Sequence, residues 1–115
     1  MKIAFDVKGT LNGNNETNVR RLYDAFKKRG HTMFVWSNSI GYAADAVRDL
    51  KLDVEYMSKF LPSERDYDTN QYMDIAVEDD RSQTWLAAKK FVFVDDLDDG
   101  TDVDKLVEEL TSAKT

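Results

Sequence analysis

Short apolar runs and segments of helical periodicity alternate along the chain. The apolar runs predict five strands, at Ile3–Phe5, Met33–Trp36, Val54–Met57, Asp74–Val77 and Phe91–Val94. Apolar residues that recur every three or four positions predict helices over Glu16–Arg29, Gly41–Leu50, Ser82–Lys89 and Val103–Leu110. The polar stretch Pro62–Gln71 predicts a connection with one helical turn. This alternation is typical of a parallel sheet that is covered on both faces.

The first predicted strand leads to a carboxylate and then to a glycine. Asp6 lies at or near the carboxyl end of this strand, and in open parallel sheets that edge is where ligands bind. Gly9 permits a tight backbone path, and the Thr10 hydroxyl can hydrogen-bond back across the loop. An aspartate held there can be a nucleophile, a metal ligand or both. The pattern Asp-x-x-Gly-Thr alone fits a plain strand end equally well, so its meaning depends on the polar residues after the later strands.

The composition narrows the classes of protein and of site. The 115 residues, 42% of them hydrophobic, fit one domain over residues 1–115 with one core. The chain has no cysteine and one histidine, which excludes a disulfide framework, a thiolate metal site and a multi-histidine zinc site within one chain. A net charge of -6 argues against general nucleic-acid binding. No segment approaches the roughly 18 apolar residues of a membrane span, and no leader pattern opens the chain, so we expect a cytoplasmic protein without membrane contact.

Polar residues follow each of the first four predicted strands. The four clusters are Asp6, Ser37-Asn38-Ser39, Lys59 and Glu78-Asp79-Asp80. Because the carboxyl ends of parallel strands meet at one edge of a sheet, all four can gather there. A carboxylate can attack phosphorus, a hydroxyl and a lysine can hold phosphoryl oxygens, and further carboxylates can hold Mg²⁺. The metal and the lysine would offset the repulsion between an anionic nucleophile and an anionic substrate.

These ordered clusters resemble the motifs of the haloacid dehalogenase-like superfamily of phosphohydrolases, over nearly the whole chain. The first family motif, Asp-x-Asp-Gly-Thr, is similar to Asp6-Val7-Lys8-Gly9-Thr10. The second motif, a hydrophobic strand that ends in Ser or Thr, is similar to Phe34-Val35-Trp36-Ser37. The third is a lysine before strand four, and Lys59 is the only lysine between Lys51 and Lys89. The fourth, a hydrophobic strand that ends in an acidic pair, is similar to Ile75-Ala76-Val77-Glu78-Asp79-Asp80.

The resemblance implies a three-layer α/β/α Rossmann-like fold, with a five-stranded parallel sheet of order 5-4-1-2-3 and no large cap domain. It implies that Asp6 is the nucleophile and a Mg²⁺ ligand, and that the backbone carbonyl of Lys8 is a further ligand. Ser37 and Asn38 would bind the phosphoryl group, and Lys59 would steady both the nucleophile and the phosphoryl charge. Asp79 would anchor the metal, with Glu78 or Asp80 as its acidic partner, depending on register.

Lys8 departs from the family pattern, because phosphatases of the family usually carry an aspartate there as general acid and base. Such help is typically worth about 10²- to 10⁴-fold in rate, so its loss should slow both chemical steps. Three interpretations stay open. Lys8 could act as an acid if burial or a neighbouring cation lowered its pKa. It could pair with Asp6 and tie up the nucleophile, or it could point away from the phosphate and leave only its carbonyl in place.

Two rival interpretations compete with this motif assignment. The stretch Asp95–Asp99 is denser in acid than the fourth motif, but it follows the fifth strand and lacks a preceding lysine in the required order. We interpret it as a solvated acidic loop next to the site. A receiver domain of two-component signalling also combines an aspartate, a hydroxyl and a lysine on a five-stranded parallel sheet. Its acidic pair comes first and its lysine last, so the order in this chain disfavours it.

The sequence therefore predicts a small, lidless, Mg²⁺-dependent phosphatase-like hydrolase that works through a phospho-aspartate at Asp6. In this superfamily an open site favours a macromolecular or bulky phosphorylated substrate, or a neighbouring subunit that serves as the lid, so we expect a monomer or a homodimer. The alternative, motivated by Lys8, is a catalytically weak or inactive relative that binds metal, phosphate or a protein partner. A receiver-like phospho-acceptor domain is the third interpretation.

Overall fold

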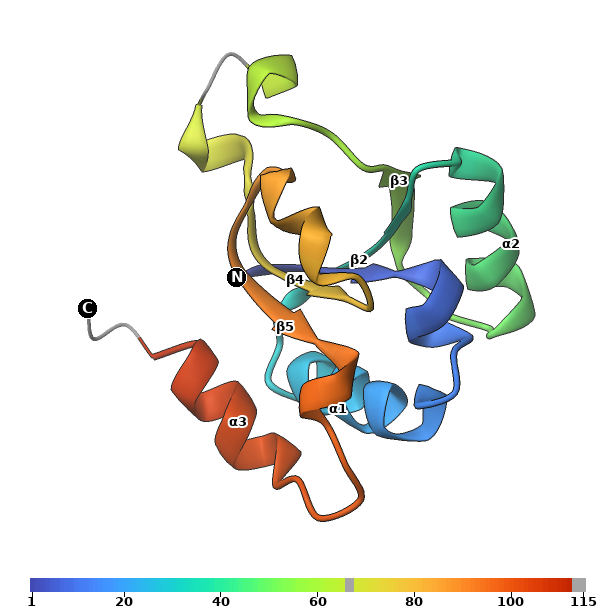
Figure 1. The fold of residues 1–115 in the computed structure, drawn as a ribbon, viewed down its shortest axis with the longest axis vertical. Helices are drawn as coiled ribbons and strands as arrows, with labels where there is room; N and C mark the ends of the chain where they lie inside the picture. The colour runs from blue at the N-terminus through green and yellow to red at the C-terminus, as the bar shows by residue number, and fades with distance from the viewer. Residues whose placement is uncertain (66–67, 113–115) are drawn as a thin grey trace.

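A five-stranded parallel sheet forms the centre of the structure, a computed structural model that describes residues 1–65 and 68–112 (Figure 1). The strands are β1 (Lys2–Asp6), β2 (Thr32–Ser37), β3 (Glu55–Ser58), β4 (Met73–Glu78) and β5 (Ala88–Phe93). Neighbouring strands pair in the order β3-β2-β1-β4-β5, and every pair is parallel. The predicted α/β class and the order 5-4-1-2-3 are confirmed, since the second is the same order viewed from the other side of the sheet.

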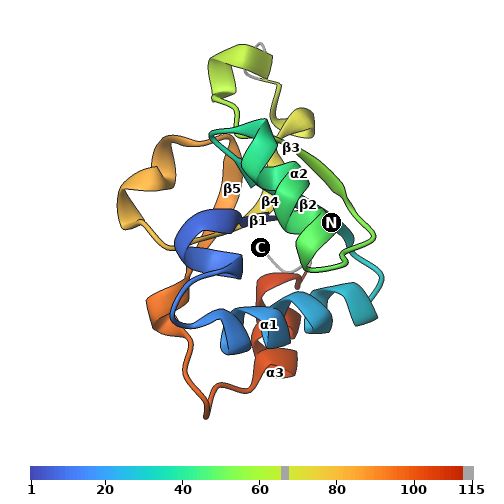
Figure 2. The same ribbon diagram turned by 90° about the vertical axis from the view of Figure 1, so that its right-hand side faces the viewer.

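Three α-helices cover one face of this sheet. They are α1 (Glu16–Lys28), α2 (Ile40–Asp49) and α3 (Val103–Leu110). Each contributes to one apolar cluster, in which Val19, Ala43 and Val107 pack with Phe5 and Val35 from the central strands. Figures 1 and 2 show α1 and α3 side by side below the sheet. The bounds of these helices agree with the sequence prediction to within one residue at each end.

The opposite face of the sheet has no α-helix in the part of the chain that is described. Its apolar cluster joins the buried side chains of Ala4 and Trp36 in the sheet to Phe60, Leu86 and Ala87 from loops. Right-handed crossovers explain why the two faces differ. The connections from β1 to β2 and from β2 to β3 lie on one face, and those from β3 to β4 and from β4 to β5 lie on the other. In their described residues, the connections to β4 and β5 contain the 3-10 turns η2 (Pro62–Arg65), η3 (Thr69–Gln71) and η4 (Arg81–Trp85) and no α-helix. The expected three-layer α/β/α arrangement is therefore wrong in its second helical layer.

The predicted helix over Ser82–Lys89 is also wrong, because its first half is η4 and its last two residues belong to β5. The predicted connection Pro62–Gln71 forms two 3-10 turns instead of one, and residues 66–67 lie outside the described part. No helix in residues 1–65 or 68–112 combines the length and the apolar character that a membrane crossing requires.

Candidate active site

The carboxyl edge of the sheet brings together the residues that the sequence predicts for the site. Asp6 and Ser37 are the last residues of β1 and β2, and Lys59 follows β3 directly. Figure 2 faces this edge, where the turn η1 (Val7–Leu11) follows β1. A pocket of about 390 Å³ opens here and is lined by Asp6, Lys8, Ser37, Asn38, Ser39, Tyr42, Lys59, Asp79, Asp80 and Gln83. Of the predicted site residues, only Glu78 is absent from its wall.

Two hydrogen-bonding partners fix the carboxylate of Asp6, one on each oxygen. The Lys59 ammonium lies 3.0 Å from Oδ1, and the Thr10 hydroxyl donates to Oδ2 at 3.1 Å. The side chains of Asp6 and Lys59 are only 8% and 5% exposed. Thr10 lies in the turn after β1 and Lys59 follows β3, so the fold itself sets the orientation of this carboxylate before any ligand arrives.

Glu78 lies beneath the pocket and supports Lys59. It is completely buried, and its Oε1 lies 2.6 Å from the Lys59 Nζ. Trp36 donates from its indole Nε1 to the other oxygen at 2.9 Å. Both oxygens of Glu78 are therefore engaged away from the pocket. Glu78 is thus the anchor of Lys59, and not a group that faces a ligand.

Burial changes the ionisation of this cluster. Burial raises the pKa of Glu78 to about 7, and the nearby charge of Asp6 also raises it. The interactions with Lys59 and Trp36 lower this pKa but do not outweigh burial. Burial also raises the pKa of Asp6, against the opposing charge of Lys59. Burial would lower the pKa of Lys59, but its bonds to Glu78 and Asp6 outweigh this and raise it. One buried cation thus faces two buried carboxylates, and the cluster favours a further positive charge nearby.

The turn after β1 brings Asp79 next to Asp6. Gly9 has a φ of +80°, and a Cβ atom at this position would overlap the Asp79 carboxylate. Only glycine combines this backbone angle with such a close approach. An interaction with the Asp79 side chain raises the pKa of Asp6. Like charges so placed favour a proton or a cation near them.

These residues fit Mg²⁺ held by few protein ligands. Mg²⁺ usually keeps several waters and is bound through one or two carboxylates together with substrate phosphates. Asp6 and Asp79 supply two carboxylates, and the Lys8 carbonyl is the third oxygen expected from the sequence. Among the described residues no group of three or more His, Cys, Asp or Glu side chains surrounds one point. Asp80 accepts the Ser82 N–H at 2.9 Å and caps η4, so its carboxylate already has a structural role.

The end of β2 forms the opposite wall of the pocket. The Ser37 side chain is buried, and its Oγ accepts the Ser39 N–H at 3.3 Å. The Ser37 carbonyl accepts the Lys59 N–H at 2.9 Å, which joins the ends of β2 and β3. Asn38 is exposed on the pocket wall. The sequence reasoning missed Tyr42, which also lines the pocket and is 61% exposed, although its position in the first turn after the Ser37 motif could have indicated it.

Lys8 is exposed on the pocket wall and takes part in no ion pair or hydrogen bond of its side chain with any described residue. The buried cation that pairs with Asp6 is Lys59. The interpretation in which Lys8 ties up the nucleophile is therefore not realised in this structure.

The acidic loop after β5 is engaged in structural contacts. Arg81 lies 2.9 Å from Asp95 and 2.7 Å from Asp96, and its guanidinium stacks over Phe93. Asp98 accepts the Gly100 N–H at 2.9 Å within the loop. These contacts agree with the interpretation of a solvated acidic loop beside the site.

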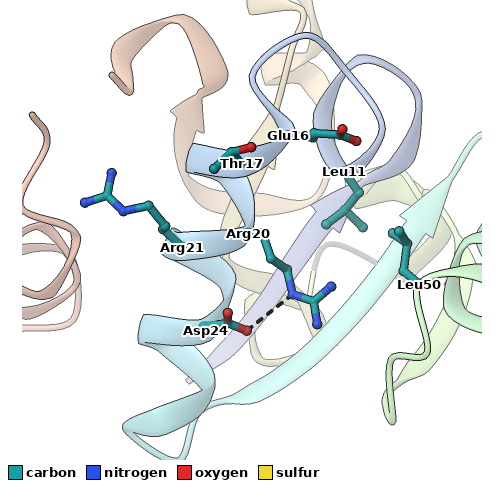
Figure 3. A pocket seen from close by; sticks show the side chains of 7 residues that line it. All are labelled: Leu11, Glu16, Thr17, Arg20, Arg21, Asp24 and Leu50. Atoms are coloured by element: carbon teal, nitrogen blue, oxygen red, sulfur yellow. Dashed lines mark hydrogen bonds and ion pairs between the residues drawn. The ribbon is translucent and has the colours of Figure 1, made fainter. Parts of the chain in front are cut away.

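A separate hollow of about 500 Å³ lies between α1, η1 and the end of α2 (Figure 3). Its lining residues are Leu11, Glu16, Thr17, Arg20, Arg21, Asp24 and Leu50. Arg20 pairs with Asp24 at 3.3 Å, and Figure 3 shows Arg21 directed away from this pair. None of the predicted site residues lines this hollow, so it does not belong to the candidate site.

No protein-family model, no curated protein and no solved structure matches this chain. The motifs in the sequence and the geometry at the carboxyl edge of the sheet are therefore the observations that bear on function.

Proposed function

We propose that this protein is a haloacid dehalogenase-like, Mg²⁺-dependent phosphohydrolase that forms a phospho-aspartate at Asp6. One observation carries the proposal: the Asp6 carboxylate lies in an open pocket, fixed by Lys59 and Thr10, with Asp79 beside it. A strand end alone requires none of these partners. A carboxylate that attacks phosphorus must be oriented and its charge offset, and these partners can supply both.

In the proposed reaction an oxygen of Asp6 attacks the phosphorus of a phosphomonoester. The bond from phosphorus to the leaving oxygen breaks, and that oxygen takes a proton from the Lys8 ammonium or from water. Water then attacks the phosphorus of the acyl phosphate, and the bond from phosphorus to the Asp6 oxygen breaks. One proton of this water returns to the group that protonated the leaving oxygen, so the products are inorganic phosphate and the free Asp6 carboxylate. Lys59 and Ser37 hold phosphoryl oxygens during both steps. Asp6, Asp79 and the Lys8 carbonyl would hold Mg²⁺, which would supply Lewis-acid stabilisation of the phosphoryl charge.

The test is hydrolysis of p-nitrophenyl phosphate with millimolar Mg²⁺, since this leaving group needs little help from a general acid. We expect Asp6→Asn to reduce turnover to background, because the amide is a poor nucleophile. Asp53→Asn is the matched control, since Asp53 is exposed and lies outside the pocket lining. Turnover that Asp6→Asn leaves unchanged would end the proposal.

A catalytically weak relative that binds phosphate or metal is the second candidate function, and the exposed Lys8 favours it. Lys8→Asp separates the two. A large gain in hydrolysis would mean that the wild-type residue limits an otherwise complete site. A loss would mean that Lys8 takes part in the reaction. A label from a small phosphodonor that stays on Asp6 for hours would instead favour a receiver-like phospho-acceptor.

A further inference from the structure

A second hollow adjoins the Asp6 pocket across a shared wall. This hollow has a volume of about 690 Å³, and its floor includes Gly9, Asn12 and Asn14. Lys8 and Asp79 line both this hollow and the Asp6 pocket. A ligand whose phosphoryl group sits at Asp6 can therefore extend past Lys8 into the second hollow, which we call the adjoining hollow.

Among the described residues, Lys8 is the only basic residue in the lining of either cavity whose side chain has no ion-pair or hydrogen-bond partner. The two basic residues of the Asp6 pocket are Lys8 and Lys59, and Lys8 is the single basic residue in the lining of the adjoining hollow. The Lys59 ammonium is engaged with Asp6 and Glu78. The Lys8 side chain is exposed and has no ion-pair or hydrogen-bond partner in residues 1–65 or 68–112. An anion on the ligand beyond the phosphoryl group would meet this ammonium first.

The floor of the adjoining hollow adds neutral hydrogen-bond donors. Asn12 accepts the Gly9 N–H through its Oδ1 at 3.1 Å, which leaves its amide nitrogen as a donor. Asn14 is exposed on the same floor. Amide donors next to a lysine suit a phosphate or a carboxylate better than they suit an apolar group, because each N–H needs an acceptor.

We propose, on the basis of the proposed function, that Lys8 selects phosphomonoesters whose leaving group carries a second anion, either a phosphate or a carboxylate. The reacting phosphoryl group lies at Asp6, and the second anion pairs with the Lys8 ammonium at the wall of the adjoining hollow. Lys8 then acts as a specificity residue in place of the acid and base that this position holds in related phosphatases.

The experiment compares matched substrates that differ in the second anion. One pair is 3-phosphoglycerate and glycerol 3-phosphate, and the other is adenosine 3′,5′-bisphosphate and adenosine 5′-monophosphate. We expect the wild-type protein with Mg²⁺ to prefer the doubly anionic member in kcat/KM by about tenfold or more, mainly through KM. Lys8→Gln should bring this ratio close to one, whereas Lys8→Arg should keep it. Lys27→Gln, which removes an exposed charge of α1 outside both cavities, should leave the ratio unchanged.

Two results would overturn the inference. One is a wild-type protein that does not distinguish the members of either pair. The other is a Lys8→Gln variant that lowers kcat for both members equally and keeps the ratio, which would make Lys8 a proton donor instead. If no ester is hydrolysed, the proposed function fails, and calorimetric binding of the same pairs with Mg²⁺ then tests Lys8 separately. A binding preference that Lys8→Gln removes supports anion selection, and equal binding refutes it.

Discussion

Replacing Gly9 by alanine tests whether the turn after β1 sets the position of Asp79. Gly9 has a φ of +80°, a conformation that costs a residue with a side chain about 1–2 kcal/mol. The added methyl group would also overlap the Asp79 carboxylate. Gly30 offers a matched control, because its φ is +82° but a methyl group there meets nothing within 4 Å. We expect Gly30→Ala to lose about 1–2 kcal/mol of unfolding free energy from backbone strain alone.

Gly9→Ala should lose the same amount and, in addition, displace Asp79. This carboxylate is exposed and can swing away, so the further loss of stability is that of a strained rotamer, about 0.5–1.5 kcal/mol. The larger effect should be on the affinity for Mg²⁺, because Asp79 then moves away from Asp6. The Mg²⁺ concentration for half-maximal hydrolysis of p-nitrophenyl phosphate should rise by about 10- to 100-fold in Gly9→Ala and stay unchanged in Gly30→Ala.

Urea unfolding of both variants gives the stability terms, and a Mg²⁺ titration of activity or of calorimetric heat gives the effect on the metal. Equal losses of stability in the two variants, together with an unchanged Mg²⁺ response in Gly9→Ala, would refute the reasoning. In that case the contact between Gly9 and Asp79 would have no part in the site.

Two further substitutions test the buried part of the site and the core. Lys59→Met leaves Asp6 and Glu78 facing each other without a cation, which should cost about 3–5 kcal/mol at pH 8. Without the cation, the pKa values of Asp6 and Glu78 rise further above their unfolded values, so the loss of unfolding free energy should be smaller at pH 5 than at pH 8. Urea midpoints that give the same loss at both pH values would contradict this. Tyr23→Phe removes a buried hydroxyl that has no partner among the described residues, and it should raise the free energy of unfolding by up to about 1 kcal/mol in thermal melts. A clear loss of stability would show that this hydroxyl is satisfied in solution.

The α-helices could be predicted because their signals are local and strongly periodic, whereas the strand order is expected only from the resemblance to the haloacid dehalogenase-like superfamily. The helix Val103–Leu110 keeps its predicted bounds, since an apolar stripe and an Asp102 cap both specify it. The segment after Arg81 could not be predicted in this way. Its apolar residues fit a helix as well as an extended chain, and distant partners decide between them. The Ala87 N–H donates to the Phe60 carbonyl at 3.1 Å, and the Ala87 carbonyl accepts the Met73 N–H at 3.0 Å.

The positions of the candidate site residues could also be predicted, but their orientations could not. Parallel strands place Asp6, Ser37 and Lys59 at one edge whatever their side chains do. The sequence allows either Glu78 or Asp80 as the partner of Asp79. Strand alternation explains in retrospect why Glu78 does not line the pocket, because Glu78 lies two residues after Ala76 and shares its face of the sheet with Trp36. The place of Lys8 depends on the turn geometry of η1, which no local pattern specifies.

The candidate site has a buried part, which includes Lys59 and Glu78, and an exposed part, which includes Lys8 and Asp79. Glu78 belongs to the buried part because it contacts Lys59 and Trp36 and does not line the pocket. Its two oxygens each accept from one donor, Lys59 and Trp36. An amide in its place presents an NH₂ group where one of these oxygens lies, so Glu78→Gln turns a donor toward either Lys59 or Trp36. The Lys59 ammonium then loses its second counter-charge and shifts its hydrogen bonding toward Asp6, where it competes with the phosphoryl group. If Asp6 is the nucleophile, as proposed, changes in the buried part of the site would act on its reactivity. Changes at Lys8 and Asp79, which line the exposed part, would act on which ligands bind.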